Sequence, residues 1–277
     1  MEITFHGVRG STPCHGPETA RYGGNTSCVS IAIAGHDPIL FDLGTGLRYF
    51  GATQPHDGSF RGHCLLSHLH WDHIQGLPFF APLLCDGAAL TVYGPAQEDG
   101  RTLDQVMHAT VRPPLFPVGL DAFPGSIRFV DVSDTDIEIG EVQIMARLIP
   151  HVGLTCGYRV SHNGKSVAYL SDHQMPYDGS LSASSAALEL IGGCDLVIHD
   201  AQYVTSEFAQ KSTWGHCTVD YAVWLAAEAG AKTLALFHHD PTRCDDDLDQ
   251  LVMLAIKAGQ RCGVRVIAAS EGLQISL

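Results

Sequence analysis

Hydrophobic residues along the chain form many short runs that end in glycine, proline or polar side chains. Such runs predict buried strands, whereas apolar positions three or four residues apart predict helices. The expected strands cover residues 2–8, 28–34, 38–41, 64–66, 90–93, 127–132, 136–139, 142–149, 155–161, 165–170, 195–198, 233–237, 264–268 and 273–276. The expected helices cover residues 98–110, 183–191, 218–229 and 245–258, and a short one begins near residue 72.

The order of these elements indicates a layered fold. The strands gather in two series, each followed by helices, and no repeat, low-complexity tract or linker divides the chain. A length of 277 residues is enough for one large domain. Because a sheet must bury an apolar face, this order favours two sheets packed face to face with helices outside. We therefore expect one α/β domain over residues 1–277.

One short stretch, residues 67–73, concentrates side chains that can bind metal. It follows an apolar run and contains His68, His70, Asp72 and His73. In extended backbone, histidines two positions apart point to the same side, and the next two side chains follow after the chain turns. Imidazole and carboxylate groups at this spacing are typical ligands of zinc, iron or manganese. A chance cluster among the 16 histidines is the weaker interpretation.

Further polar side chains stand at the ends of predicted strands. They are Asp42, His151, Asp172, Asp200 and His238. Strand ends at one edge of a sandwich can converge, and loops at such an edge often carry function. Each position alone is a weak signal, but together with residues 67–73 they predict a single site.

The phrase His68-x-His70-x-Asp72-His73 resembles the signature of the metallo-β-lactamase-fold hydrolases. The resemblance implies a four-layer αββα sandwich of two mixed β-sheets, built from two similar halves. It also implies two divalent metal ions as cofactors. Zinc is the expected ion, and the same ligands accept manganese or iron.

The resemblance also assigns ligands position by position. It implies that metal one is bound by His68, His70 and His151, and that metal two is bound by Asp72, His73 and His238. Asp172 and a water or hydroxide would bridge the ions, and Asp42 would orient a ligand without binding metal itself. His238 and His239 are adjacent; we choose His238 because it directly follows the strand.

Two more phrases, residues 199–203 and 215–218, are similar to the paired acid and histidine motifs of the branch that includes ribonuclease Z and small-molecule cyclic phosphodiesterases. This similarity implies that His216 donates to the phosphate or the leaving oxygen and that Asp200 orients it. Asp72 is the third catalytic candidate. Ribonuclease Z usually has glutamate where Asp200 stands, so the similarity is to the branch. The alternative is a helix-capping histidine beside an exposed aspartate.

Two loops are candidates for substrate contacts. Residues 9–24 lead to Asn25 and Thr26, whose side chains could donate to an anion beside two glycines, although an ordinary connection fits equally well. The proline-rich segment 113–117 carries Phe116. It could close over the site, with Phe116 stacking on a flat substrate group, or it could pack on the core.

Composition narrows the choice of partners. The formal net charge of −14 argues against broad nucleic-acid binding, which requires a basic face. Nine cysteines without a C-x-x-C motif indicate reduced thiols and a cytoplasmic location. No apolar run approaches the length of a membrane span, so no membrane partner is expected. A homodimer is the default assembly.

Together these features predict a dinuclear metal-dependent phosphodiesterase that cleaves a small anionic phosphodiester, such as a cyclic nucleotide or a cyclic ribose phosphate. A tRNA 3′-processing endonuclease is one alternative, but the segment 96–125 has only two basic residues and no obvious RNA-gripping arm. A lactone or β-lactam hydrolase could use the same metals, because one fold supports many chemistries. A non-catalytic binding protein would be expected to lack ligands, and none of the family's motifs is missing.

Overall fold

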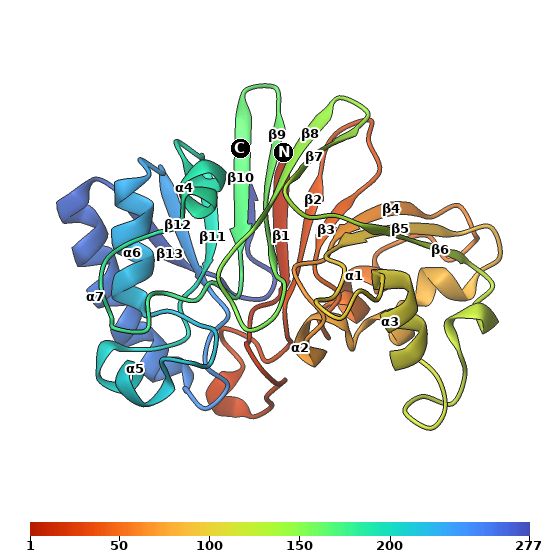
Figure 1. Ribbon diagram of the computed structural model, residues 1–277, viewed down its shortest axis with the longest axis horizontal. Coiled ribbons are helices and arrows are strands. Elements are labelled where there is room, and N and C mark those ends of the chain that lie inside the picture. Colours follow the sequence, from red (N-terminus) through yellow and green to blue (C-terminus); the bar gives the residue numbers. More distant parts are fainter.

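Two seven-stranded β-sheets form the middle of the protein, in a computed structural model that describes residues 1–277 (Figure 1). The first sheet has the strand order β14 (Gln274–Ser276), β1 (Glu2–Gly7), β2 (Cys28–Ala32), β3 (Ile39–Phe41), β4 (Arg61–Leu65), β5 (Ala89–Gly94) and β6 (Ser126–Asp131). The second has the order β13 (Arg265–Ala268), β12 (Thr233–Phe237), β11 (Leu196–Asp200), β10 (Lys165–Leu170), β9 (Cys156–His162), β8 (Val142–Leu148) and β7 (Thr135–Ile139).

The two sheets are built alike. In each, one part is antiparallel and the other parallel: β3 to β6 run parallel in the first sheet, and β10 to β13 in the second. The sheets are therefore mixed, as expected from the resemblance. Parallel neighbours end at the same edge of a sheet, so the residues that follow them are brought together.

Helices cover the outer faces of both sheets. The α-helices of the chain are α1 (Leu47–Ala52), α2 (Trp71–Ile74), α3 (Leu103–Thr110), α4 (Ser185–Ile191), α5 (Thr205–Lys211), α6 (Val219–Glu228) and α7 (Asp245–Cys262). In Figure 1, α1 and α3 lie beside the first sheet, whereas α4, α6 and α7 lie beside the second. The predicted four-layer αββα sandwich is confirmed.

Three hydrophobic clusters hold these layers together. One lies under the helices of each sheet, and the third joins the inner faces of the two sheets. Phe41 of the first sheet stacks on Tyr169 of the second with ring centroids 4.5 Å apart, and Phe237 packs on the same tyrosine at 5.7 Å. Fully burying such a side chain stabilises the fold by roughly 1.5–3 kcal/mol. The inner core thus fixes one sheet against the other close to the strand ends.

Some elements differ from the expectations. The helix expected from residue 98 begins at Leu103, because Thr102 and Gln105 exchange side-chain and backbone hydrogen bonds that cap the helix there. The short helices α1 and α5 lie in segments for which the sequence predicted no helix or strand. The expected strands 155–161 and 165–170 pair as an antiparallel hairpin, in whose turn Asn163 and Gly164 have φ values of 49° and 72°.

The loop of residues 9–24 is anchored rather than open. The buried Arg9 guanidinium donates to the carbonyl oxygens of Gly23 and Arg243, each at 2.8 Å, and lies 3.5 Å from the Asp245 carboxylate. These contacts join the loop to the start of α7 and fix the backbone near the site.

All nine cysteines are unpaired. None of the helices has both the length and the apolar character that crossing a bilayer requires.

Candidate metal centre

The strand ends bring most of the predicted site residues together. Residues that end a strand or follow one closely are Asp42 (β3), His68 (β4), His151 (β8), Asp172 (β10), Asp200 (β11) and His238 (β12). His70 directly precedes α2, and Asp72 and His73 lie in its first turn. Seven of these side chains form two neighbouring donor groups, and a further group of Asp172, Asp200, His216 and His238 overlaps the second.

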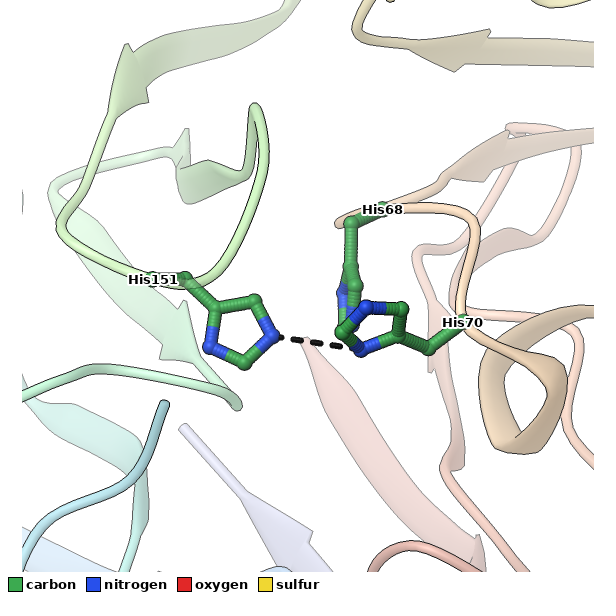
Figure 2. A group of neighbouring side chains, drawn as sticks. All are labelled: His68, His70 and His151. Atoms are coloured by element: carbon green, nitrogen blue, oxygen red, sulfur yellow. Dashed lines mark hydrogen bonds between the residues drawn. The ribbon is translucent and has the colours of Figure 1, made fainter. Parts of the chain in front are cut away.

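The first group contains the three histidines assigned to metal one: His68, His70 and His151 (Figure 2). Their ligand nitrogens all lie within 4.8 Å of one another, and Nε2 of His151 is 3.3 Å from Nδ1 of His70. Burial lowers the pKa of His151 to about 4 and holds that of His68 well below its usual value. The imidazoles are therefore neutral at neutral pH, with lone pairs free for a cation.

Gly215 holds the His151 ring in place. Its carbonyl oxygen accepts a hydrogen bond from Nδ1 of His151 at 2.7 Å, which leaves Nε2 free to face the other two histidines. A Cβ atom at Gly215 would come within 2.3 Å of the ring, and φ is +95° there. Only glycine suits this position, because a side chain would displace the ring.

The second group contains Asp72, His73, Asp172 and His238, all buried, with donor atoms within 4.8 Å of one another. Nε2 of His73 lies 2.7 Å from Asp172 Oδ2 and 3.2 Å from Asp72 Oδ2. Nε2 of His238 lies 3.0 Å from Asp172 Oδ1 and 3.1 Å from Asp72 Oδ2. Two imidazole nitrogens and two carboxylates thus converge on one point.

The structure shows that the adjacent residues His238 and His239 point in different directions. His238 has φ of 56°, a left-handed conformation that turns its ring into the donor group. The ring of His239 points elsewhere: its Nε2 donates to the carbonyl oxygen of Ala269 at 2.9 Å. His238 is therefore placed to bind metal and His239 is not.

Asp172 lies between the groups. Its Oδ2 is 3.3 Å from Nε2 of His68, a member of the first group, and its Oδ1 is 3.0 Å from Nε2 of His238, a member of the second. The side chain is only 1% exposed. A carboxylate that faces both groups has the position expected of a bridging ligand.

These residues fit metal cations by their chemistry. Nε2 of His68, Nε2 of His73 and Oδ1 of Asp172 are buried without a hydrogen-bond partner, which is costly unless a cation satisfies them. Burial alone would lower the pKa of His238, but the carboxylates, Asp172 foremost, outweigh it and raise the pKa to about 10. The same balance raises the pKa of His73. Without metal, protons compensate the buried carboxylates, and metal binding would release them.

Asp42 positions the donors without belonging to either group. It accepts four hydrogen bonds: from Ser67 N at 2.7 Å, Ser67 Oγ at 2.9 Å, Tyr169 Oη at 2.7 Å and Nδ1 of His73 at 2.7 Å. Because Nδ1 of His73 donates to Asp42, its Nε2 is the nitrogen that faces the second group. The predicted orienting role agrees with these contacts, whereas no pattern in the sequence indicated that Tyr169 takes part.

Replacing Asp42 with asparagine should weaken metal binding about 10- to 100-fold, since an amide nitrogen cannot accept these hydrogen bonds. The measurement is competition with a chelating dye. Tyr169→Phe removes only one of the four donors and should weaken binding less. Equal metal affinity in Asp42→Asn and the wild type would contradict the positioning role.

A second positioning contact was not foreseen. Nδ1 of His238 donates to Gln202 Oε1 at 2.8 Å, and Gln202 Nε2 donates to Ser11 Oγ at 3.2 Å. The backbone N–H of Ser11 donates to Asp72 Oδ2 at 2.8 Å. The chain 9–24 thus contributes to the site through Ser11. Gln202 follows Asp200 by two positions in the quoted phrase, but glutamine alone gives no distinctive signal.

Asp200 and His216 form a pair beside the second group. Nδ1 of His216 donates to Asp200 Oδ2 at 2.7 Å, and both residues are buried. Asp200 Oδ1 accepts from the backbone N–H of Gln202 and of Cys217, at 3.0 and 3.3 Å, so the carboxylate is fixed. The alternative of an exposed aspartate is wrong, because Asp200 is 0% exposed.

A cavity of about 490 Å³ opens onto the cluster. Its lining residues are Ser11, His70, Trp71, Asp72, Val152, Asp172, Tyr203, Thr213, Trp214 and His216. Metal donors and the His216–Asp200 pair therefore meet one open space, where a substrate could reach both.

The loop residues predicted to contact substrate lie outside this cavity. Thr26 is fully buried and bonds to Thr45, so its predicted role is wrong. The side-chain nitrogen of Asn25 donates to the Glu271 carboxylate. Phe116 packs edge-on against Phe79 with ring centroids 5.9 Å apart. Figure 1 shows its loop extending beyond α3, away from α2, so it does not cover the cluster.

Comparison with known proteins gives the family. The model of the beta-lactamase superfamily domain matches residues 39–239, and this range includes every member of both donor groups. The chain belongs to the beta-lactamase superfamily. With its cluster of metal donors, it is a metal-dependent hydrolase of that family.

Relatives along the whole chain agree with this. The chain is 26% identical to ribonuclease Z of Haloarcula marismortui over 99% of this chain and 96% of that protein. The metallo-β-lactamase-fold protein YhfI of Bacillus subtilis has a TM-score of 0.73 at 19% identity, over 99% of this chain and 98% of the other. A diphosphatase of the PhnP family has a TM-score of 0.69 at 18% identity, over 100% and 97% of the two chains.

Proposed function

We propose that this protein is a dinuclear metal-dependent phosphodiesterase that cleaves a small, anionic phosphodiester. One observation carries the proposal: two donor groups that share the Asp172 carboxylate open onto the same cavity as His216, held by Asp200. Two ions for the phosphoryl group and a proton donor for the leaving oxygen are the parts that phosphodiester hydrolysis requires.

In this proposal His68, His70 and His151 hold one ion, and Asp72, His73 and His238 hold the other. Asp172 binds both. When bound, two divalent ions would polarise the phosphoryl oxygens and lower the pKa of a water molecule. The charges of two such ions exceed those of the Asp72 and Asp172 carboxylates. The cavity would therefore attract an anion although the whole chain is acidic.

The residues of the chain do the rest. Because Nδ1 of His216 donates to Asp200 at 2.7 Å, Nε2 is free to donate a proton in the cavity. Asp200 fixes the orientation of the imidazole through this hydrogen bond, and the leaving oxygen receives the proton from Nε2. Asp72 Oδ2, which lies 3.2 Å from Nε2 of His73 and 3.1 Å from Nε2 of His238, accepts from the backbone N–H of Ser11, and this contact fixes the carboxylate.

The donor set narrows the cofactor without naming it. It offers imidazole nitrogens and carboxylate oxygens and no thiolate, a set that zinc, manganese and iron all accept. We propose zinc as the resident ion. The unpaired cysteines support a reducing compartment, in agreement with a cytoplasmic protein.

An RNA substrate is the second candidate. It is supported by the similarity to ribonuclease Z, which covers 99% of this chain, and this similarity weighs against the argument from net charge that disfavours nucleic-acid binding. The net charge of −14 favours a small substrate instead.

A substrate panel tests these alternatives. The metal-loaded protein should hydrolyse a cyclic nucleotide, a cyclic ribose phosphate or an aryl phosphodiester faster than a lactone, a β-lactam or a precursor tRNA. Cleavage of the lactone or β-lactam without any phosphodiester would overturn the proposal. Cleavage of the precursor tRNA alone, at its 3′ end, would favour the endonuclease.

A further inference from the structure

Two exposed tryptophans line the cavity at the metal cluster. Trp71 is 58% exposed and Trp214 is 60% exposed, and both belong to the cavity that His70, Asp172 and His216 also line. The third tryptophan, Trp224, packs against the hydrophobic cluster under α6 and α7. Exposing an indole to water is unfavourable, so a pair of them beside a metal cluster indicates a surface for a ligand.

Both indoles are fixed relative to the donors. Trp71 begins α2 and stands between His70 and Asp72, which belong to the two donor groups. Trp214 precedes Gly215, whose carbonyl oxygen holds His151 and whose N–H donates to Gln174 Oε1 at 2.7 Å. One tryptophan comes from each half of the chain. The distance from either ring to the phosphate position is thus set by the same backbone that sets the metal ligands.

The rest of the rim supports a flat ligand rather than an aliphatic one. The ring of Tyr203 meets His216 edge-on, with centroids 5.5 Å apart. Lys211 Nζ lies 4.7 Å from the centroid of Tyr203 and 6.0 Å from that of Trp214. Aromatic faces stack on any nucleobase, and a nearby cation adds to attraction for an anionic nucleotide.

We propose that Trp71 and Trp214 bind a nucleobase carried by one ester of the phosphodiester, so that the substrate is a nucleoside phosphodiester rather than a sugar phosphate without a base. This inference rests on the proposed function and adds the substrate class. A cavity of about 490 Å³ has the size of a small-molecule site, which suits a single nucleotide.

Matched substrates test this directly. Adenosine 3′,5′-cyclic phosphate and methyl riboside 3′,5′-cyclic phosphate present the same diester with and without a base. Trp71→Ala and Trp214→Ala should each lower the ratio of kcat/KM between the two substrates about tenfold, mainly through KM, because stacking acts on the base alone. Trp71→Phe should keep most of the ratio. Tyr49→Ala, an aromatic of similar exposure at a different cavity, is the control and should keep it fully.

Metal content is measured for each variant, since both tryptophans adjoin the donor groups. An unchanged ratio, or equal losses on both substrates at full metal content, overturns the inference while leaving the phosphodiesterase in place. A wild-type protein that cleaves an aryl phosphodiester but neither of these substrates overturns the inference alone, and one that cleaves none of the three overturns the proposed function.

A binding measurement then tests the inference separately. Adenosine 5′-monophosphate should quench the tryptophan fluorescence of the wild type, and ribose 5-phosphate should not. Equal responses to the two compounds would refute the binding of a nucleobase by Trp71 and Trp214.

Discussion

Replacing Asp172 with alanine should remove bound metal and lower kcat/KM about a thousandfold or more, because metal ions supply several kcal/mol of transition-state stabilisation. The Asp172 carboxylate faces both donor groups: its two oxygens are 3.3 Å from His68 Nε2 and 3.0 Å from His238 Nε2. Without this carboxylate each ion loses a ligand, and the two ions lose the group that screens their mutual repulsion. Metal analysis and turnover should therefore fall together.

Asp172→Asn distinguishes the role of Asp172 as a metal ligand from its role in packing, since the amide keeps the shape of the side chain and removes its charge. It should also lose metal, because an amide binds divalent cations less strongly than a carboxylate. Asp178→Ala, an exposed aspartate whose carboxylate bonds only to nearby Ser180, is the matched control and should keep both metal and activity. Two ions per chain and normal turnover in Asp172→Ala would contradict the bridging position.

Replacing His216 with alanine should keep both ions and lower kcat about 10²- to 10⁴-fold, the usual value of a positioned general acid. His216 belongs to neither of the two groups assigned to the ions, and its Nδ1 is held by Asp200 at 2.7 Å. The loss should be largest for a diester with an alkoxide leaving group, which requires a proton. It should be small for a p-nitrophenyl ester, whose leaving group is stable as an anion.

His108→Ala provides the comparison, because His108 lies on α3 and bonds only to Asp104 and Asp121. It should have wild-type kcat on both esters. If His216→Ala slowed both esters equally at full metal content, His216 would act by binding the phosphate rather than by protonating the leaving oxygen.

The strands were predicted well because their apolar runs are clear. Most site residues follow such strands, so their positions were predicted as well. Asp172 follows the buried strand β10, and His238 follows β12. The same pattern is silent on short helices: α1 has only six residues, so its buried Leu47 and Phe50 define no period. Local pattern therefore predicted the long elements and missed those that depend on tertiary packing.

Prediction of the site from local sequence pattern has the same limit. The motif predicted the members of both donor groups, but the contacts that orient them cross the chain: Asp42 bonds to Tyr169 across 127 positions, and His151 to Gly215 across 64. Thr26 was a reasonable donor for an anion from its sequence neighbours, and only the fold shows its hydroxyl turned to Thr45. Trp71 and Trp214 carried no signal because exposure depends on the fold.

The central claim is that two ions occupy these two donor groups. Anomalous X-ray diffraction at the zinc edge, on crystals of the zinc-loaded protein, tests it most directly. The account predicts two peaks per chain about 3.5–4 Å apart, one at His68, His70 and His151 and the other at Asp72, His73 and His238, with Asp172 touching both. A single peak, or peaks away from these side chains, would contradict it.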